Sequence, residues 1–365
     1  MTAVVPPKAL TALTGKAGGL LSQWSRFLPK PGGGGAVGLD VGSAGFKIVE
    51  LTKQGTQTTL QRAVVEELPT TDRKAMAAAL KAAFERHQIG SRRVNSSLSG
   101  PAVVVRYVEL PAMTDQELAS AIQFEAEKYL PFNPAECVTD SCVIEKLDHD
   151  KRMRVLLAAA KKSLVEERLD LLQEAGLVPQ VIDVDAFALA NAFLASQAAG
   201  KPGETPAILD IGAEITTITV LRGSHPAFTR EIMSGGGNAF TQAIAEKLGL
   251  APAAAESLKR KPDGRAAELF EAVKPLLDNL VSEIRLSFNY YESQADHGID
   301  ALYLTGGVTR LEGLGRYVQD NVEVEMRNWN PVEWLQVAPT AAQSGLAQHG
   351  HRLAVGIGLA LRSLG

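Results

Sequence analysis

The sequence predicts an α/β protein that contains two related domains. The first observation is an internal repeat, because residues 37–50 (VGLDVGSAGFKIVE) and 207–220 (AILDIGAEITTITV) both read as a strand, an Asp-x-Gly turn and a second strand. The second is the alternation of strand-like and helix-like segments along the body of the chain. The third is size, since 365 residues with 45% hydrophobic content suffice for two domains with ordinary cores.

Each repeated hairpin places a carboxylate beside a tight glycine turn. The carboxylates belong to Asp40 and Asp210. Glycine lets the backbone approach a ligand closely, and unshielded backbone N–H groups bind anionic oxygens. Two such hairpins that face each other are therefore predicted to hold a polyphosphate and its divalent cation between the two domains.

Helix and strand signals alternate through the rest of the first half. Thr114 and Glu117 form a capping-box pattern, and Ser163 and Glu166 form a second one. In order, the expected elements are a helix over 72–87 that stops at Gly90, a strand over 103–108, a helix over 114–129 that ends before Pro131, a strand over 154–159, a helix that stops at Gly176, a strand over 178–182 and a helix from Asp183 or Asp185 to residue 198.

The second half begins with the repeat of the hairpin. A glycine run at 235–237 then precedes a helix that contains Phe240, Ile244 and Leu248. Residues 253–292 are expected to be mostly helical. A buried strand over 301–304 then enters a Gly-Gly turn at the start of another helix, and residues 353–365 form a closing helix.

These signals suggest a domain organisation. Residues 1–35 form a tail and linker, and residues 36–205 form the first domain, which residues 336–365 complete. Residues 206–335 form the second domain. The stretch 94–180 lies between the first hairpin and the helix near residue 183, so we interpret it as a subdomain inserted into the first domain.

Composition excludes several classes of function. The net charge is −4 and no basic stripe with interleaved aromatic residues appears, so a nucleic-acid binder is not expected. Cys137 and Cys142 are the only cysteines and have no nearby His pair, so no zinc site is expected. Two thiols and no cleavable signal sequence fit a reducing cytoplasm. No run reaches the roughly 20 apolar residues of a membrane span.

The amino-terminal segment differs from the rest, because residues 1–39 carry basic side chains and no acidic one. Apolar residues recur at helical spacing over 10–28. One interpretation is an interfacial helix that inserts Trp24 and Phe27 into a membrane surface. The alternative is a disordered extension, which three glycines within the segment favour.

The order of the turn signals resembles the superfamily that contains actin, heat-shock-70 proteins and sugar kinases. The shared succession is two strand–Asp-x-Gly hairpins, a glycine pair before a helix, and a strand–Gly-Gly turn before a further helix. In that superfamily, two ribonuclease-H-like domains close on ATP. The resemblance therefore implies two actin-like domains around a central nucleotide cleft, with ATP and Mg²⁺ as cofactors.

The resemblance also implies roles for particular residues. Asp40 and Asp210 match the two family aspartates, which hold magnesium mainly through its retained waters. The matches to the nucleotide-contacting loops are Gly42, Ser43, Ala44, Gly45 and Lys47 in the first phosphate loop, Gly212, Ala213 and Glu214 in the second, the glycine pair Gly235 and Gly236, the pair Glu256 and Lys259, and the adenosine loop Gly306, Gly307 and Val308.

Simpler interpretations compete at some of these positions. Lys47 can also be interpreted as an exposed lysine on a strand, without a role in binding. Glu256 and Lys259 have the spacing of an ordinary intrahelical ion pair. Glu214 stands where the family often has glycine, so it either orients water or lies at the rim.

Hydrolysis needs a group that positions the attacking water. Relatives carry that group just before the helix expected near residue 183, and the match of the following alanines puts Asp183 there. The alternative is that Asp183 or Asp185 only caps the helix.

Within the superfamily, several strings resemble the PilM family of type IV pilus assembly proteins. They are GLDVGSAGFKIVEL (38–51), AIQFEAEKYLPF (121–132), FTQAIAEKLGL (240–250), PLLDNLVSEIRLSFNYY (275–291) and LTGGVTRLEGL (304–314). The inserted subdomain is shared with FtsA, the cell-division actin homologue. FtsA normally ends in a membrane-targeting helix after a linker, whereas this sequence closes on a Gly- and Ala-containing helix.

Membership of the PilM family implies an ATP-dependent scaffold, cytoplasmic and peripheral to the inner membrane, that works with other pilus components. It would capture the cytoplasmic tail of the inner-membrane protein PilN beside the inserted subdomain. We expect residues 121–132 to form part of that surface. Two alternatives remain, an ATPase or kinase whose turnover is the function and a division-type protein that forms filaments.

Overall fold

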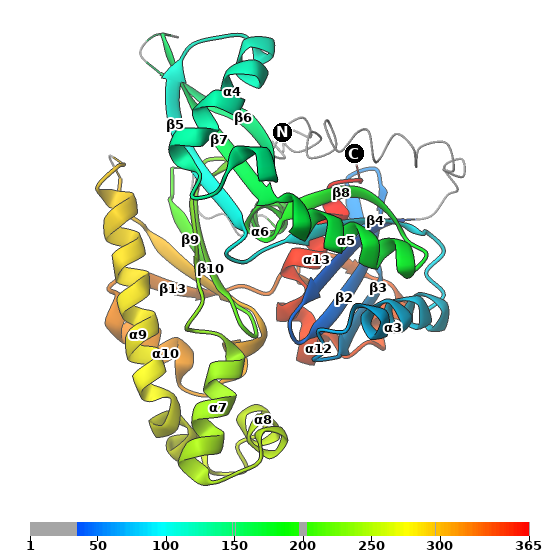
Figure 1. The fold of residues 1–365 in the computed structure, drawn as a ribbon. Coiled ribbons are helices and arrows are strands. Elements are labelled where there is room, and N and C mark those ends of the chain that lie inside the picture. Colours follow the sequence, from blue (N-terminus) through cyan, green and yellow to red (C-terminus); the bar gives the residue numbers. More distant parts are fainter. Residues whose placement is uncertain (1–34, 148, 150, 197–202, 296, 365) are drawn as a thin grey trace.

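The computed structural model describes residues 35–147, 149, 151–196, 203–295 and 297–364. They form two α/β domains, with a small third sheet attached to the first domain (Figure 1). The amphipathic pattern expected over 10–28 lies outside the described residues. Within the described part of the chain, no helix combines the length and the apolar run that a bilayer crossing requires.

The first domain is built on a six-stranded sheet that contains the first predicted hairpin. Its central strand alternates Val37 and Leu39, which enter the core on one face, with Gly38 and Asp40 on the other face. The glycine turn after Asp40 then starts the next strand antiparallel to the first. In spatial order the strands are β14 (Gln336–Val337), β3 (Gln57–Glu67), β2 (Gly45–Gln54), β1 (Ala36–Gly42), β4 (Arg93–Leu98) and β8 (Val178–Val184).

Two helices, α3 (Arg73–Arg86) and α5 (Lys162–Glu174), cover the outer face of this sheet. The predicted helix over 72–87 is confirmed, and Asp72 caps it by accepting a hydrogen bond from the Lys74 N–H at 2.9 Å. Leu80 and the other buried residues of α3 pack against the apolar face of β1 and β2.

Two boundary predictions for these helices are wrong. Gly90 is not the stop signal, because α3 has already ended and Gln88 takes the left-handed conformation with φ of 52°. The capping box predicted at Ser163 does not form. The strand β7 (Arg152–Lys161) runs directly into α5, so Ser163 already lies inside the helix and no side chain caps its start.

The inserted subdomain is a three-stranded antiparallel sheet with one covering helix. The capping box predicted for that helix is confirmed, since Thr114 accepts from the Glu117 N–H and the Glu117 carboxylate accepts from the Thr114 N–H at 2.7 Å. The sheet order is β5-β7-β6, and the new elements are β5 (Val103–Pro111), α4 (Asp115–Tyr129), a 3-10 turn η2 (Pro134–Glu136) and β6 (Cys137–Leu147).

This subdomain is shorter than the predicted 94–180. β4 and β8 are paired parallel strands of the six-stranded sheet, and α5 packs against α3. The insertion therefore comprises the residues between the end of β4 and the start of α5, about 99–161. The sequence suggested wider bounds because the chain leaves and re-enters the first sheet with ordinary strand and helix signals.

The second domain repeats the hairpin in a five-stranded sheet of order β11-β10-β9-β12-β13. A large apolar cluster joins one face of this sheet to the long helix α9 and to α7 and α10. Its elements are β9 (Pro206–Ile211), β10 (Thr216–Arg222), β11 (His225–Ile232), α7 (Gly237–Leu248), α8 (Pro252–Arg260), α9 (Ala266–Glu292), β12 (Ala301–Thr305), the 3-10 turn η3 (Gly307–Arg310), α10 (Leu314–Val322) and β13 (Glu325–Asn328).

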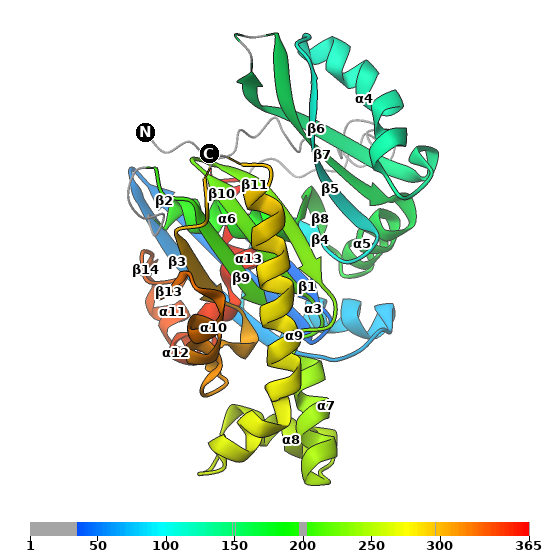
Figure 2. The ribbon, with the colours of Figure 1, turned by 90° about the vertical axis from the view of Figure 1, so that its left-hand side faces the viewer.

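Two apolar helices, α6 (Asp185–Ala195) and α13 (Ala354–Leu361), lie between the two sheets (Figures 1 and 2). The chain returns to the first domain through β14 and three short helical turns before α13. These turns are α11 (Pro339–Ala342), α12 (Leu346–His349) and η4 (Gly350–Arg352). The molecule is thus layered as helices, sheet, two central helices, sheet and helices.

Candidate functional site: the cleft between the domains

The turns of the two predicted hairpins meet at one cleft of about 560 Å³. Strand periodicity explains why, because side chains two residues apart share a face of a sheet. Leu209 and Ile211 enter the outer core of the second domain, so Asp210 lies on the inner face with Ile208. The first sheet mirrors this arrangement, with its aspartate also on the inner face. Both carboxylates therefore reach the same cleft.

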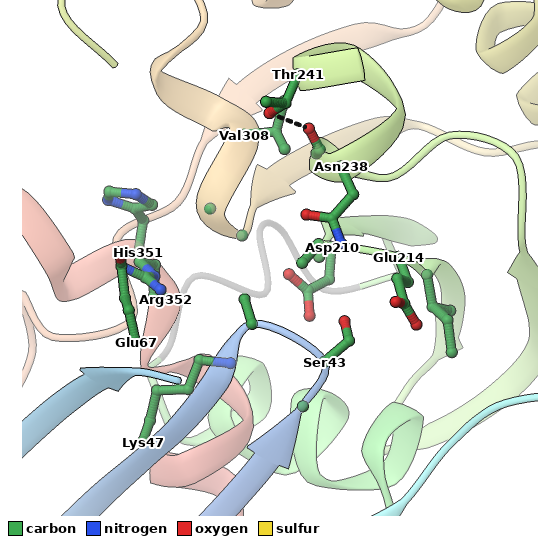
Figure 3. A pocket seen from close by; sticks show the side chains of 18 of the residues that line it. Ser43, Lys47, Glu67, Asp210, Glu214, Asn238, Thr241, Val308, His351 and Arg352 are labelled. Atoms are coloured by element: carbon green, nitrogen blue, oxygen red, sulfur yellow. Dashed lines mark hydrogen bonds and ion pairs between the residues drawn. The ribbon is translucent and has the colours of Figure 1, made fainter. Parts of the chain in front are cut away.

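The first hairpin carries Lys47 into the cleft beside Asp40. The two residues are directly opposite each other in the β1–β2 register, and the Lys47 Nζ lies 3.0 Å from the Asp40 Oδ2. Figure 3 shows Lys47 and Ser43 on this hairpin, with Asp210 across the cleft from them. The interpretation of Lys47 as an exposed strand lysine is therefore wrong.

Gly45 shapes the first loop from behind. It does not line the cleft, and its φ of 130° is a conformation that other residues rarely adopt. A Cβ atom there would lie 2.1 Å from the Glu66 carbonyl oxygen on β3. Glycine thus allows β2 to begin against β3 immediately after the turn.

The predicted glycine run holds the second loop in the same way. The Gly237 N–H donates to the Gly212 carbonyl oxygen at 2.9 Å. A Cβ atom on Gly236 would lie 2.5 Å from the Ala213 carbonyl oxygen, so only glycine permits this approach. Gly235 and Gly236 therefore lie behind the loop, and the position that lines the cleft is Gly237.

Glu256 and Lys259 do more than pair along α8. The Lys259 ammonium lies 2.6 Å from the Glu256 carboxylate, 2.8 Å from the Gly237 carbonyl oxygen and 2.7 Å from the Thr241 hydroxyl, so it joins α8 to the start of α7. Burial alone would raise the pKa of Glu256. The hydrogen bonds from Lys259 and Thr241 outweigh that effect and lower the pKa to about 2.

Strand register also explains the place of the adenosine-loop glycines. Thr305 pairs with Asp210 across the parallel strands β12 and β9, so the next residue, Gly306, lies against the acidic turn. Gly306 has φ of 98°, and a Cβ atom there would lie 2.4 Å from the Asp210 Oδ1. Side chains larger than hydrogen would displace the carboxylate.

The structure corrects the prediction for Asp183. Its carboxylate is fully buried, does not line the cleft and lies 2.7 Å from the Nε of Arg362, the residue that directly follows α13. Asp183 still belongs to β8, whereas Asp185, in the first turn of α6, lines the cleft. Neither carboxylate caps α6, because the N-cap is Val184 and no side chain bonds there.

Three carboxylates thus influence one another in the cleft. Burial raises the pKa of Asp210 to about 7; nearby Lys47 opposes this shift, and the charges of Asp40 and Asp185 add to it. Burial and repulsion from Asp40 likewise raise the pKa of Asp185. A cation placed between these groups would relieve the repulsion.

The form of that cation site follows from the spacing of its donors. Among the described residues, no three His, Cys, Asp or Glu side chains cluster tightly enough to coordinate a metal by themselves. Mg²⁺ retains several waters in most protein sites and is held by one or two carboxylates with phosphate oxygens. Asp40 and Asp210, which line the same cleft, would hold a hydrated magnesium ion of this kind.

The sequence did not reveal that a group of arginine and histidine side chains also lines the cleft. In this group, Arg260 and Arg352 both pair with Glu67, at 2.8 and 2.9 Å. Because α8 belongs to the second domain and Glu67 to β3, one of these pairs joins the two domains. The group consists of Arg260, Arg310, His349, His351 and Arg352.

A pH effect is expected from His351 in this group. Burial, with nearby Arg310 and Arg352, lowers its pKa to about 4. Between pH 6.5 and 4 the unfolded chain binds more protons here than the folded protein, so the free energy of unfolding should fall as the pH is lowered. His351→Asn should reduce that fall by no more than about 3 kcal/mol. Urea unfolding at pH 4.5 and 7.5 measures this change in the free energy of unfolding. An identical pH dependence in His351→Asn and in the unmodified protein would contradict the prediction.

All but four of the sequence-predicted site residues line this cleft. The exceptions are Gly45, Gly235, Gly236 and Asp183. The residues that do line it are Asp40, Gly42, Ser43, Ala44, Lys47, Asp210, Gly212, Ala213, Glu214, Glu256, Lys259, Gly306, Gly307 and Val308.

Two sheets with matching acidic hairpins at a shared cleft, separated by two central helices, define the actin-like ATPase fold. The ethanolamine utilization protein EutJ from Carboxydothermus hydrogenoformans is similar to this chain in fold alone. The TM-score is 0.54 at 15% sequence identity, over 92% of this chain and 91% of that chain.

Within that fold class, residues 38–364 match the family of the type IV pilus assembly protein PilM, and the chain belongs to this family. The solved structure of a PilM–PilN type IV pilus biogenesis complex contains a similar chain, with a TM-score of 0.81 and 32% sequence identity. The match covers 90% of this chain and 98% of that chain. The resemblance to PilM inferred from the sequence is confirmed.

Proposed function

We propose that this chain binds ATP with Mg²⁺ in the interdomain cleft and serves as a scaffold that docks the cytoplasmic tail of a PilN-like inner-membrane protein. The observation that carries the proposal is the similarity of this chain to a chain of a solved PilM–PilN complex. The two are 32% identical, and the match covers 98% of that chain. In this proposal the protein acts at the cytoplasmic side of the inner membrane with other pilus components.

The cleft supports the nucleotide part of the proposal. Ser43 on one hairpin and Ala213 on the other line the cleft at the two turns, and both turns are proposed to offer backbone N–H groups to phosphate oxygens. Lys47 supplies a positive charge at the same end. The Glu256–Lys259 pair and Val308 line the cleft beside Gly237, and ribose and adenine are proposed to lie there.

Magnesium should contribute to nucleotide affinity through Asp40 and Asp210. We expect Asp40→Asn or Asp210→Asn to weaken ATP binding in magnesium by about 10–100-fold, because each change removes a carboxylate that orients the hydrated ion. Calorimetric titration with and without magnesium measures the effect. Asp320→Asn, an exposed change on α10, is the matched control. Equal losses with and without magnesium would contradict the proposed metal role.

Hydrolysis, where it occurs, is proposed to depend on Asp185 rather than Asp183. Asp185 lines the cleft and its charge acts on Asp210, and a carboxylate near the phosphate loops can orient a water molecule. Its location does not imply rapid turnover. The scaffold proposal predicts slow phosphate release from the unmodified protein, and fast release abolished by Asp185→Asn would favour the ATPase alternative instead.

The docking surface is proposed to lie on the face of the inserted sheet opposite α4. There the apolar side chains of Val105, Tyr107 and Ile144 are only half-buried where they meet α6. Several adjacent apolar contacts suit a short apolar peptide, and the open edge of β6 offers backbone hydrogen bonds.

Residues 121–132, the surface expected from the sequence, are a weaker candidate. Ile122, Ala126 and Leu130 are buried between α4 and its own sheet. Among the described side chains of this stretch, Phe124 is the one large apolar group that is exposed, at 76%, and it borders a shallow depression together with Ala121. A single exposed aromatic residue is common on protein surfaces.

A peptide titration tests both docking and its location. A synthetic peptide with the cytoplasmic sequence of the PilN-like partner should bind the full chain, and Ile144→Ser should weaken binding by about tenfold. Phe124→Ser is the matched control and should change affinity by less than about threefold. The reverse pattern would move the site to α4, and absence of binding to the unmodified protein would refute the scaffold function.

A further inference from the structure

One short segment contacts the cleft, the second domain and the inserted subdomain at the same time. It connects β4 to β5 and comprises residues 99–102. Ser99 lines the cleft. The Gly100 N–H donates to the carboxylate of Glu231, on the edge strand β11 of the second domain, at 2.8 Å. This bond crosses from one domain to the other.

The connecting segment is firmly joined to the inserted sheet. The Val103 N–H donates to the Gly100 carbonyl oxygen at 2.9 Å, and the Lys161 N–H donates to the Ala102 carbonyl oxygen at 3.0 Å. The first bond fixes the start of β5, and the second fixes the end of β7. A displacement of Gly100 would therefore move both strands through which the chain enters and leaves the subdomain.

Gly100 has the conformation that this bond requires. Its φ is 97°, in the region where side chains with a Cβ atom are strained, and the nearest atom to a Cβ there would be Ile215 Cδ1 at 3.7 Å. Ile215 lines the cleft and directly precedes β10. The backbone N–H of Gly100 is thus presented to the second domain at a point adjacent to the second phosphate loop.

Glu231 also responds to charge in the cleft. Burial raises its pKa to about 7, the Gly100 N–H opposes that shift, and the charge of Asp185 adds to it. Asp185 in turn interacts with Asp40 and with the Ser99 hydroxyl. A positive charge added near these carboxylates would favour the ionised form of Glu231, and an ionised carboxylate accepts a stronger hydrogen bond than a protonated one.

We propose that Glu231 is a positioning residue that couples occupancy of the cleft to the inserted subdomain through its hydrogen bond to Gly100. The inference rests on the proposed binding of nucleotide and magnesium in the cleft. It adds that the second domain holds the docking subdomain by this bond, so that the affinity for the partner tail depends on the nucleotide.

Hydrogen exchange on the full chain tests the coupling without any partner. Addition of magnesium and a non-hydrolysable ATP analogue should slow exchange at both phosphate loops, residues 38–47 and 206–217, and change exchange over β5 and β6. Glu231→Ala should keep the response of the loops and lose the response of the inserted sheet. Glu231→Gln keeps a hydrogen-bond acceptor for Gly100 but cannot ionise, so its response should be weaker than that of the unmodified protein and stronger than that of Glu231→Ala.

A matched control separates the coupling from a general loss of stability. Glu283→Ala removes a carboxylate that pairs at 2.5 Å with Arg230, the neighbour of Glu231, but both partners belong to the second domain. This variant should respond like the unmodified protein. A response of the inserted sheet that persists in Glu231→Ala, or that is absent from the unmodified protein while its loops respond, would overturn the inference.

The partner peptide then measures the coupling as a ratio of affinities. The peptide affinity of the unmodified protein should change by about fivefold or more on nucleotide addition, and that ratio should approach one in Glu231→Ala. If the peptide fails to bind while the exchange responses occur as expected, the docking function fails and the coupling stands. If neither phosphate loop responds, nucleotide binding and the coupling both fail.

Discussion

Replacing Arg362 with leucine is expected to destabilise the folded protein by about 3–5 kcal/mol, one of the two largest effects we predict. The Asp183 carboxylate is fully buried, and the Arg362 Nε at 2.7 Å is the cation that balances it. The side chain of Arg362 is itself only 5% exposed. Removal of one partner leaves the other charge buried without compensation.

The pH dependence should identify the cause of this loss. Burial raises the pKa of Asp183, and Arg362 opposes that shift. Without Arg362 the pKa should rise further, so the folded variant holds a proton that the unfolded chain releases above about pH 4. The free energy of unfolding of the variant, relative to the unmodified protein, should therefore decrease as the pH rises.

Urea unfolding of two further variants completes the test. Asp183→Leu combined with Arg362→Leu should recover part of the loss, because no unpaired charge remains. Arg316→Leu removes an exposed arginine that pairs with Asp320 at 3.6 Å, and should change stability by less than about 0.5 kcal/mol. If Arg362→Leu destabilised the protein no more than Arg316→Leu, the buried Asp183–Arg362 pair would not stabilise the fold.

Replacing Gly306 with alanine is expected to reduce the affinity for ATP by about 100-fold or more, which is the second of the two largest effects we predict. The new Cβ atom would lie 2.4 Å from the Asp210 Oδ1, and within 2.6 Å of the backbone nitrogen and oxygen of Ile211. Both sets of atoms belong to the second acidic turn, and the φ of 98° is strained for alanine. The turn must therefore move away from the position in which it faces the first hairpin.

Calorimetry with ATP and magnesium measures this loss, and thermal unfolding shows how much of it reflects reduced stability. Gly90→Ala is the control, because Gly90 has no neighbour within 4 Å of a Cβ atom and no positive φ. It should leave both affinity and melting temperature unchanged. Normal nucleotide affinity in a folded Gly306→Ala protein would show that the cleft does not depend on the close approach of β12 to Asp210.

Elements with strong local signals were correctly predicted from the sequence. The two Asp-x-Gly hairpins, the capped helix α4 and the glycine turn at Gly306 all formed where expected. The strands β3, β4, β6, β11, β13 and β14 were not predicted. β6 and β11 are edge strands of their sheets, and the side chains along them are mostly half-buried, so they lack the clear apolar alternation that marks a strand in sequence.

Asp183 and Asp185 show the limit of local patterns most clearly. Asp183 and Asp185 both lie near the start of the same helix, and each has apolar neighbours on both sides in the sequence. Arg362, which directly follows α13 far along the chain, lies beside Asp183 and forms a buried ion pair with it. Asp185, two residues later, is the one of the two that lines the cleft.

The sequence by itself determined the repeated acidic turns, the glycines that let them approach each other, and the membership of the PilM family. Those features are local, because they depend on backbone conformation and on the alternation of side chains within a few residues. The tertiary structure decided which acidic residue enters the cleft, that a basic group drawn from both domains lines it, and that Glu231 reaches Gly100. Each of these depends on contacts between segments distant in sequence, which no local pattern encodes.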